Sequence, residues 1–286
     1  MFHVSFGWQV AWTAAVVVGL LSVLLRTLPW RRARWLGLGV REIAVMLALY
    51  GAWCFVGAWT LRDTSGAVRR GEDIWAAERQ LHLLSEAAVQ YPLLPHPWLV
   101  HAADTYYIYG HFNMLIAAVA WTWLRHRDAY AELRRAVILF SLSATLVQIV
   151  PVAPPRLLPG HLVVDTALRY GESVYGPGGI GAPSQLAAVP SVHVGWSILV
   201  ALTVVRRSTS RWRCLAPLHP ALMGVVVVAT GNHYWADGAV SVLLLGLTWA
   251  VLRVADAAAV RRRRAPIPRV LAGPPLDSPT PTSLDA

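Results

Sequence analysis

The sequence has no lysine, few charged residues and only two cysteines, and each shortage excludes a class of protein. Charged residues make up 14% of the chain and apolar residues 56%, which is wrong for a water-soluble protein of 286 residues. Cys54 and Cys214 fall in different apolar runs and indicate neither a disulfide nor a zinc site. The composition excludes a disordered, collagen-like or disulfide-stapled chain and indicates a membrane protein.

Apolar runs of membrane-spanning length fill most of the chain. About 20 apolar residues in a helix cross the roughly 30 Å of hydrocarbon in a bilayer. We count seven such runs, at residues 8–28, 41–61, 98–124, 134–151, 186–205, 214–231 and 237–256. No small-residue cleavage pattern follows the first run, so we expect it to stay as an anchor. The sequence therefore predicts an all-α, polytopic membrane helix bundle.

The basic residues predict the orientation of the bundle. All 25 are arginine, and they lie in short clusters between apolar runs, which favours the lipid bilayer as partner and excludes nucleic acid. Loops that stay in the cytoplasm carry the arginine excess. With seven spans, nineteen arginines fall on one side and six, in loops 62–97 and 152–185, on the other. We therefore expect a multi-pass protein of the cytoplasmic membrane with its N-terminus outside and its C-terminus inside.

The first long loop, at residues 62–97, has the pattern of an amphipathic helix. Its apolar face carries Ile74, Ala77, Leu81, Leu84 and Ala88, and its charged face carries Glu72, Asp73, Glu78, Arg79 and Glu86. Such a helix is typical of a membrane interface. We expect it to form a rim or lid.

Two proline-rich segments complete the organisation of the chain. Loop 152–185 is rich in proline and glycine and cannot be a long helix. The tail after Arg264 holds six prolines and almost nothing to bury, so we expect it to be disordered. We divide the chain into an N-terminal span with a cytoplasmic loop (1–40), a catalytic membrane core (41–256) and a basic, proline-rich cytoplasmic tail (257–286).

Three polar groups at the ends of spans are candidates for chemistry, because polar residues in a membrane are costly. Ser191 and His193 open the fifth span, where a hydroxyl group, free N–H groups and the helix dipole favour an anion. His233 and Asp237 are four residues apart, so the carboxylate could hold one imidazole nitrogen protonated and leave the other free to attack. Arg156 is suited to a bidentate grip on phosphate. The predicted topology puts all of them on the non-cytoplasmic side.

The third span adds a polar stripe of Asp104, Tyr107 and His111 at positions i, i+3 and i+7. These groups could bind the hydroxyls of a polyol headgroup such as inositol. They could equally form hydrogen bonds to neighbouring helices. The sequence leaves both interpretations open.

The three groups together resemble the motifs of the type 2 phosphatidic acid phosphatase superfamily, K-x6-R-P, P-S-G-H and S-R-x5-H-x3-D. Pro-Pro-Arg at 154–156, Pro-Ser-Val-His-Val-Gly-Trp at 190–196 and Gly-Asn-His-Tyr-Trp-Ala-Asp at 231–237 look most like the inositol phosphorylceramide synthase branch. The resemblance covers roughly residues 40–256 and implies a six-helix core, to which this chain adds one N-terminal transmembrane helix.

The resemblance implies a role for each motif residue. By analogy with the superfamily, His233 is the nucleophile, Asp237 orients it and His193 protonates the leaving alcohol. Arg156 and Ser191 would bind the phosphate.

The chain departs from the motifs at three places. The lysine of the first motif would fall at Ile149, the Ser-Arg of the third at 226–227 (Val-Val), and the glycine of the second is Val192. Arg156 is then the main cation for the phosphate unless Arg169 or backbone N–H groups contribute. The inositol phosphorylceramide synthase branch also tends to lack these residues, which favours that branch.

We therefore expect metal-independent phosphoryl transfer on a membrane lipid substrate, either a lipid phosphate or a phospholipid, through a phosphohistidine. No cofactor or metal is expected, because an arginine, an imidazolium and helix N-termini can supply the charge that divalent ions carry elsewhere. Water as acceptor would make a phosphatase, and a hydroxyl compound would make a phosphotransferase. The alternative is a catalytically silent lipid-binding or transport protein with the same fold. The sequence leaves the donor lipid, the acceptor and the oligomeric state open.

Overall fold

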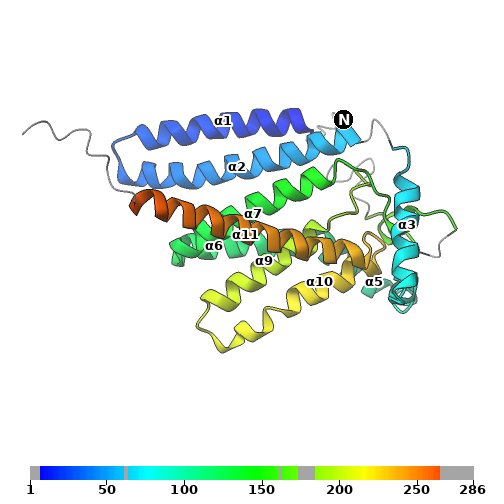
Figure 1. Cartoon of the computed structure of the whole chain (residues 1–286). Helices are drawn as coiled ribbons and strands as arrows, with labels where there is room; N and C mark the ends of the chain where they lie inside the picture. The colour runs from blue at the N-terminus through cyan, green and yellow to red at the C-terminus, as the bar shows by residue number, and fades with distance from the viewer. Residues whose placement is uncertain (1–6, 61–63, 161–162, 173–183, 265–286) are drawn as a thin grey trace, which may run out of the picture. The chain divides into compact units, whose positions relative to one another are not determined.

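The computed structural model describes residues 7–60, 64–160, 163–172 and 184–264, and its regular structure is helical (Figure 1). Among these residues, four helices are long and apolar enough to cross a membrane, Trp8–Thr27, Arg31–Thr60, Arg211–Ala229 and Trp235–Arg261. The described ranges contain no strand beyond one isolated β-bridge between Val152 and Ala187. The all-α class and the membrane character are confirmed, while the count of seven spans stays a prediction.

Contacts divide the chain into two compact units. The first unit, Met1–Trp249, holds every element except the last turns of α11 (Trp235–Arg264). The second unit is Ala250–Ala286, and its described part is the end of that helix. The tail after Arg264, which the sequence predicts to be disordered, lies outside the described residues.

The N-terminal hairpin consists of α1 (Trp8–Thr27) and α2 (Arg31–Thr60), which pack side by side (Figure 1). Pro29 breaks the helix between them, and α2 then starts ten residues before the predicted span at 41. Most of the predicted cytoplasmic loop up to residue 40 is therefore helix, because arginine, alanine and leucine are good helix formers.

The packing face of this hairpin is made of small residues. The buried residues of the two helices are Ala11, Ala15, Ser22, Ala33, Gly37, Ala44, Gly51, Cys54, Gly57 and Thr60. Small side chains let two membrane helices approach closely. Gly51 shows how closely, because a Cβ atom there would overlap the indole ring of Trp12.

The first long loop forms two helices, α3 (Ala67–Gln80) and α4 (Glu86–Gln90), where the pattern predicts one. The helix is interrupted near His82, which has a φ of 58°. The predicted faces are wrong on both sides of this break: Leu81 and Leu84 are 71% and 61% exposed, whereas Glu78 and Glu86 are 2% and 0% exposed. Glu78 is held inside by the Ala236 N–H, which is distant in sequence, and Glu86 lies 3.7 Å from Arg79 of α3.

The third predicted span is one continuous helical stretch with a π-helical turn in its middle. It runs through α5 (Pro97–Thr105), the π turn η1 (Tyr106–Gly110) and α6 (His111–Arg125). A π turn inserts one extra residue into a helix and is frequent at functional sites. This turn carries Tyr107 and ends directly before His111.

The remaining core helices are α7 (Arg127–Val147), α9 (Val192–Arg207), α10 (Leu218–Ala229) and α11. α9 contacts α6, α7 and α10. A 3-10 turn η3 (Arg211–Leu215) precedes α10. The core elements therefore surround the N-terminal turn of α9, where the second motif lies.

The segment between α7 and α9 contains only short helices in its described part, as its proline and glycine content predicts. These are η2 (Pro155–Leu157) and α8 (Thr166–Arg169). An apolar cluster of Val152, Ala153, Leu158, Ala188 and Tyr234 fixes this segment against the start of α11.

Candidate active site

His233 lies in the turn between α10 and α11, which we call the His233 turn (residues 232–237). Gly231 has a φ of 71°, a conformation that glycine adopts without strain, and it reverses the chain directly after α10. The Tyr234 N–H donates to Asp237 Oδ2 at 2.9 Å, so the aspartate caps the first turn of α11. The local sequence thus brings His233 and Asp237 to the same end of the helix.

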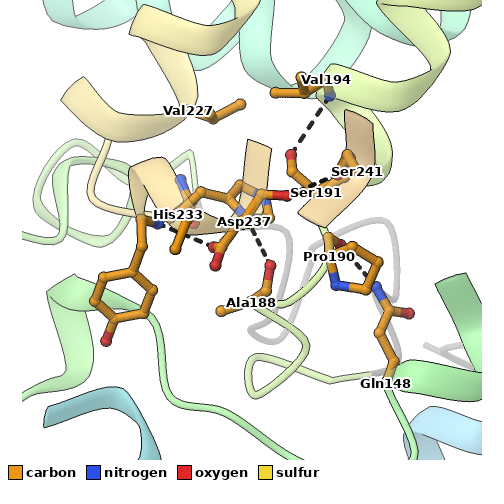
Figure 2. A network of polar contacts seen from close by, with 12 residues as sticks. Gln148, Ala188, Pro190, Ser191, Val194, Val227, His233, Asp237 and Ser241 are labelled. Carbon is orange, nitrogen blue, oxygen red and sulfur yellow. Dashed lines mark hydrogen bonds and ion pairs between the residues drawn. The ribbon is translucent and has the colours of Figure 1, made fainter. Parts of the chain in front are cut away.

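The imidazole of His233 is oriented from one side by two acceptors (Figure 2). Its Nδ1 lies 3.0 Å from Asp237 Oδ2 and 2.8 Å from the Ala188 carbonyl oxygen. Since neither oxygen has a hydrogen to give, Nδ1 carries the proton and Nε2 keeps its lone pair. His233 is 4% and Asp237 0% exposed. This is the tautomer that a nucleophilic histidine needs.

Ser191 caps α9, and backbone contacts tie that end of α9 to α11. The Ser191 hydroxyl accepts from the Val194 N–H at 3.4 Å. In return, Ser241 of α11 donates its hydroxyl to the Ser191 carbonyl oxygen at 2.8 Å, and the Ser191 N–H donates to the Asp237 carbonyl oxygen at 3.4 Å (Figure 2). The first turn of α9 is thereby held beside the His233 turn.

His193 lies in this first turn and faces His233. The two ring centroids are 5.4 Å apart with an interplanar angle of 63°. Its Nδ1 atom is buried and has no hydrogen-bond partner among the described residues. The structure therefore brings His193, His233 and Asp237 together, and their catalytic roles stay a prediction.

Arg156 lies beside the His233 turn and is almost fully buried. Its Nε donates to Asn232 Oδ1 at 2.9 Å, and its backbone N–H donates to the Gly231 carbonyl oxygen at 3.0 Å. Its Nη1 lies 3.3 Å from Asp165 Oδ2. Neither Asn232 nor Asp165 was expected to hold the arginine, since no short spacing connects them to it. Arg169, the other possible cation, is exposed, with its guanidinium 5.9 Å from the Tyr170 ring.

The predicted polar stripe of the third span divides into two parts. Tyr107 stacks on His193 with a centroid distance of 4.2 Å, and the His111 ring lies 4.1 Å from His193. The His111 Nδ1 is held 3.0 Å from the Tyr107 carbonyl oxygen. Asp104 instead accepts the Thr166 hydroxyl at 2.9 Å. Tyr107 and His111 therefore border the histidine pair. Asp104 forms a hydrogen bond to a neighbouring helix, which is the second of the two interpretations that the sequence leaves open.

Sequence reasoning missed an acidic pair next to the site. Glu78 Oε1 accepts the Ala236 N–H at 2.7 Å, and burial together with the neighbouring Glu86 carboxyl raises the pKa of Glu78 to about 8. Both glutamates lie on what a continuous amphipathic helix would present as its charged face. The only signal was their position in a segment next to a predicted site.

The comparison with protein families gives one match. The family model described as the PAP2 superfamily matches residues 72–251, which is more than half of the chain. The matched range contains every site residue described above and excludes α1 and α2. The match does not distinguish the inositol phosphorylceramide synthase branch from the rest of the superfamily. No curated protein and no solved structure matches the chain significantly.

Proposed function

The chain belongs to the PAP2 superfamily, and on that premise we propose that it transfers phosphoryl groups of a lipid phosphate or phospholipid at the extracytoplasmic face of the cell membrane. Membership itself indicates phosphatase or phosphotransferase chemistry on lipid phosphates. The observation that carries the proposal is the histidine pair, with ring centroids 5.4 Å apart and Asp237 on Nδ1 of His233. That arrangement has a nucleophile, its orienting group and a second imidazole in one buried site.

In the first step Nε2 of His233 attacks the phosphorus atom. A phosphorus–nitrogen bond forms while the bond from phosphorus to the leaving alcohol oxygen breaks. His193, in its imidazolium form, gives its proton to that oxygen. Asp237 and the Ala188 carbonyl oxygen stabilise the positive charge that develops on His233, because both lie within 3.0 Å of Nδ1.

In the second step the acceptor attacks the phosphohistidine. His193, now neutral, takes a proton from the acceptor hydroxyl, a new phosphorus–oxygen bond forms and the phosphorus–nitrogen bond breaks. His233 and the imidazolium of His193 are both restored. Water as acceptor completes hydrolysis, and a hydroxyl compound completes transfer.

The phosphate charge is stabilised by Arg156 and by the start of α9. The guanidinium is fixed by Asn232 and Asp165 before substrate binds, so little side-chain entropy is lost. Ser191 and the N–H groups of the first α9 turn present the positive end of a 16-residue helix. These groups supply the charge stabilisation without requiring a metal ion.

The surroundings of His193 favour a hydroxyl acceptor as a second possibility. Tyr107 and His111 pack against the imidazole of His193, which would activate the acceptor. A polyol headgroup needs several hydrogen-bonding partners, which these side chains can supply. An inositol-phosphate-type phosphotransferase is therefore the more specific form of the proposal.

Turnover of purified protein tests the proposal. The wild type is assayed against phosphatidic acid, an isoprenoid diphosphate and a phosphoinositide lipid, each with and without free inositol, beside His233→Ala and His193→Ala. His96→Ala is the matched control, because His96 is exposed and lies outside the site. We expect phosphate release or transfer by wild type and control, and loss of both in the two site variants.

If neither site variant lowers turnover, the catalytic assignment is wrong. If the wild type binds these lipids but turns over none, the protein is the catalytically silent lipid-binding or transport protein that is the alternative.

The orientation has a separate test. The arginine distribution supports a cytoplasmic C-terminus, so a reporter fused after Arg264 is expected to be active in the cytoplasm. A reporter protected from cytosolic enzymes would reverse the topology and the face of the site.

A further inference from the structure

We propose that Glu78, supported by Glu86 and Arg79, is a positioning group that holds the His233 turn in its catalytic geometry. Only the kinetic test of this inference rests on the proposed function. It assigns a role to the α3–α4 segment (residues 67–90) that goes beyond that of a passive rim.

The central contact joins Glu78 to the first turn of α11. Its Oε1 accepts the Ala236 N–H at 2.7 Å. The first N–H groups of a helix have no acceptor inside the helix, so a side chain must satisfy them when they are buried. Ala236 directly precedes Asp237, which itself accepts the Tyr234 N–H and orients His233. Glu78 therefore fixes the backbone that carries the orienting aspartate.

Two further contacts of the same segment act on the neighbouring residues of the turn. The Trp235 indole N–H donates to the Leu84 carbonyl oxygen at 2.8 Å. Tyr234 donates its hydroxyl to the Ala153 carbonyl oxygen at 2.7 Å, and a Cβ atom at Gly71 would lie 2.6 and 2.7 Å from those two oxygen atoms. Three successive residues of the His233 turn are thus held by, or packed against, the α3–α4 segment.

The charges around Glu78 are unbalanced. Glu78 is 2% and Glu86 0% exposed, and Arg79 Nη2 lies 3.6 Å from one carboxyl group and 3.7 Å from the other. The charged groups that face Glu78 are therefore Glu86 from α4, Arg79 from α3 and Asp237 from α11. One cation cannot neutralise two buried carboxylates, and a shared proton is the less costly state.

This state predicts a pH dependence with a definite sign. Because the pKa of Glu78 is raised to about 8, the carboxyl group is protonated at neutral pH and still accepts the Ala236 N–H through its other oxygen. The raised folded-state pKa stabilises the segment fully at low pH, and this stabilisation is lost as pH rises through about 8. Ionisation puts a second negative charge near Asp237, so turnover should fall on this alkaline limb.

The test compares Glu78→Gln, which keeps a neutral acceptor, with Glu78→Ala, which removes it. We expect Glu78→Ala to lower kcat about tenfold to a hundredfold with little change in KM, because the misplaced groups act on the chemical step. Glu78→Gln should recover most of that loss and remove the alkaline limb near pH 8. Asp73→Asn is the matched control on the same helix, since Asp73 is exposed and its ion pair within the described ranges is with its helix neighbour Arg69.

A second measurement does not depend on turnover. Hydrogen–deuterium exchange of the peptide that contains Tyr234 to Asp237 should become faster in Glu78→Ala and stay slow in Glu78→Gln and Asp73→Asn. A wild-type exchange rate in Glu78→Ala overturns the inference, and so does an alkaline limb that persists in Glu78→Gln. A wild type that turns over no lipid overturns the proposed function instead, and exchange then decides the positioning role alone.

Discussion

The α1–α2 hairpin and the core that follows it bury different kinds of residue. The hairpin packs through alanine, glycine and serine, whereas the core buries charged and ring-nitrogen side chains, among them Glu78, Arg156, His233 and Asp237. The family match covers the core and excludes the hairpin. Packing between small residues depends on side-chain size, so other small residues can replace them. Buried polar and charged groups each need a specific hydrogen-bonding or charged partner.

Polar contacts join the two regions. Trp53 of α2 donates its indole N–H to Gln148 at 3.1 Å, and Gln148 in turn donates to the Pro190 carbonyl oxygen at 3.4 Å, next to Ser191 (Figure 2). Glu42 of α2 also forms an ion pair with Arg134 of α7. Substitutions in the hairpin should change stability alone, whereas substitutions in the core should also change turnover, so the two regions can be compared by measuring both.

The largest effect is expected for Asp237→Asn in the core. An amide retains the shape of the carboxylate but can donate to His233 Nδ1, which would move the proton to Nε2 and remove the nucleophile. We expect kcat to fall by about ten-thousandfold, as loss of an orienting aspartate does in other histidine-based sites, with little change in KM. Steady-state kinetics and a thermal unfolding scan measure the two quantities. A folded variant with wild-type kcat would break the assignment of the core as the catalytic region.

Arg156→Ala should have the second-largest effect. We expect a higher KM and a kcat/KM lower by about a hundredfold, because the transition-state phosphate loses a fixed cation. Arg156→Lys should recover a part, since it restores charge without the guanidinium fork. Asp165→Asn keeps an oxygen that can accept from Arg156 and removes only the negative charge, so it should lower kcat/KM less than Arg156→Ala does. Unchanged kinetics in Arg156→Ala would assign the phosphate to Arg169 or to another group.

In the hairpin, Gly51→Ala should lower stability and leave kcat unchanged. Its Cβ would overlap the Trp12 ring, and overpacking of this kind costs about 1–3 kcal/mol. Gly39→Ala on the same helix is the control, because nothing lies within 4 Å of a Cβ there. Thermal unfolding in detergent should separate the two variants. Equal unfolding temperatures would mean that the hairpin is packed less closely than Gly51 and Trp12 indicate.

The smallest effect is expected for Ser22→Ala, which removes the 2.7 Å hydrogen bond from the Ser22 hydroxyl to the Gly37 carbonyl oxygen. Hydrogen bonds between membrane helices contribute about 0.6 kcal/mol to stability. The unfolding temperature should therefore fall only slightly, and kcat should not change. Ser241→Ala in the core removes the one hydroxyl donor that lies 2.8 Å from the Ser191 carbonyl oxygen and 2.7 Å from the Asp237 carbonyl oxygen, and it should lower kcat as well. If both serine variants behave alike, the distinction between the two regions is wrong at the level of single hydrogen bonds.

The features that sequence predicts well here are local. Hydropathy locates the apolar runs because one helix is enough to satisfy the backbone in a membrane. The four-residue spacing of His233 and Asp237 acts within one helical turn, so the contact can be expected without a tertiary structure. The expectation that His193 lies at the same site depended in addition on the topology from arginine counting, whose orientation stays a prediction.

The features that the sequence does not reveal join distant segments. Glu78 and Ala236 are 158 residues apart, and Arg156 and Asn232 are 76 apart. A glutamate in an amphipathic pattern indicates a solvent-facing side chain until its partner is known. The break at His82, by contrast, has a local signal, because Ser85 caps the start of α4 by accepting the Ala88 N–H.

The hydrogen bonds between Ser191, Asp237 and Ser241 hold the first turn of α9 beside the His233 turn, so His193 and His233 keep a fixed position relative to each other. A site whose groups are already in place needs little reorganisation to bind a mimic of the trigonal-bipyramidal transition state at phosphorus. We therefore expect orthovanadate to be a tighter ligand than orthophosphate, a preference that a site assembled only on substrate arrival would not have.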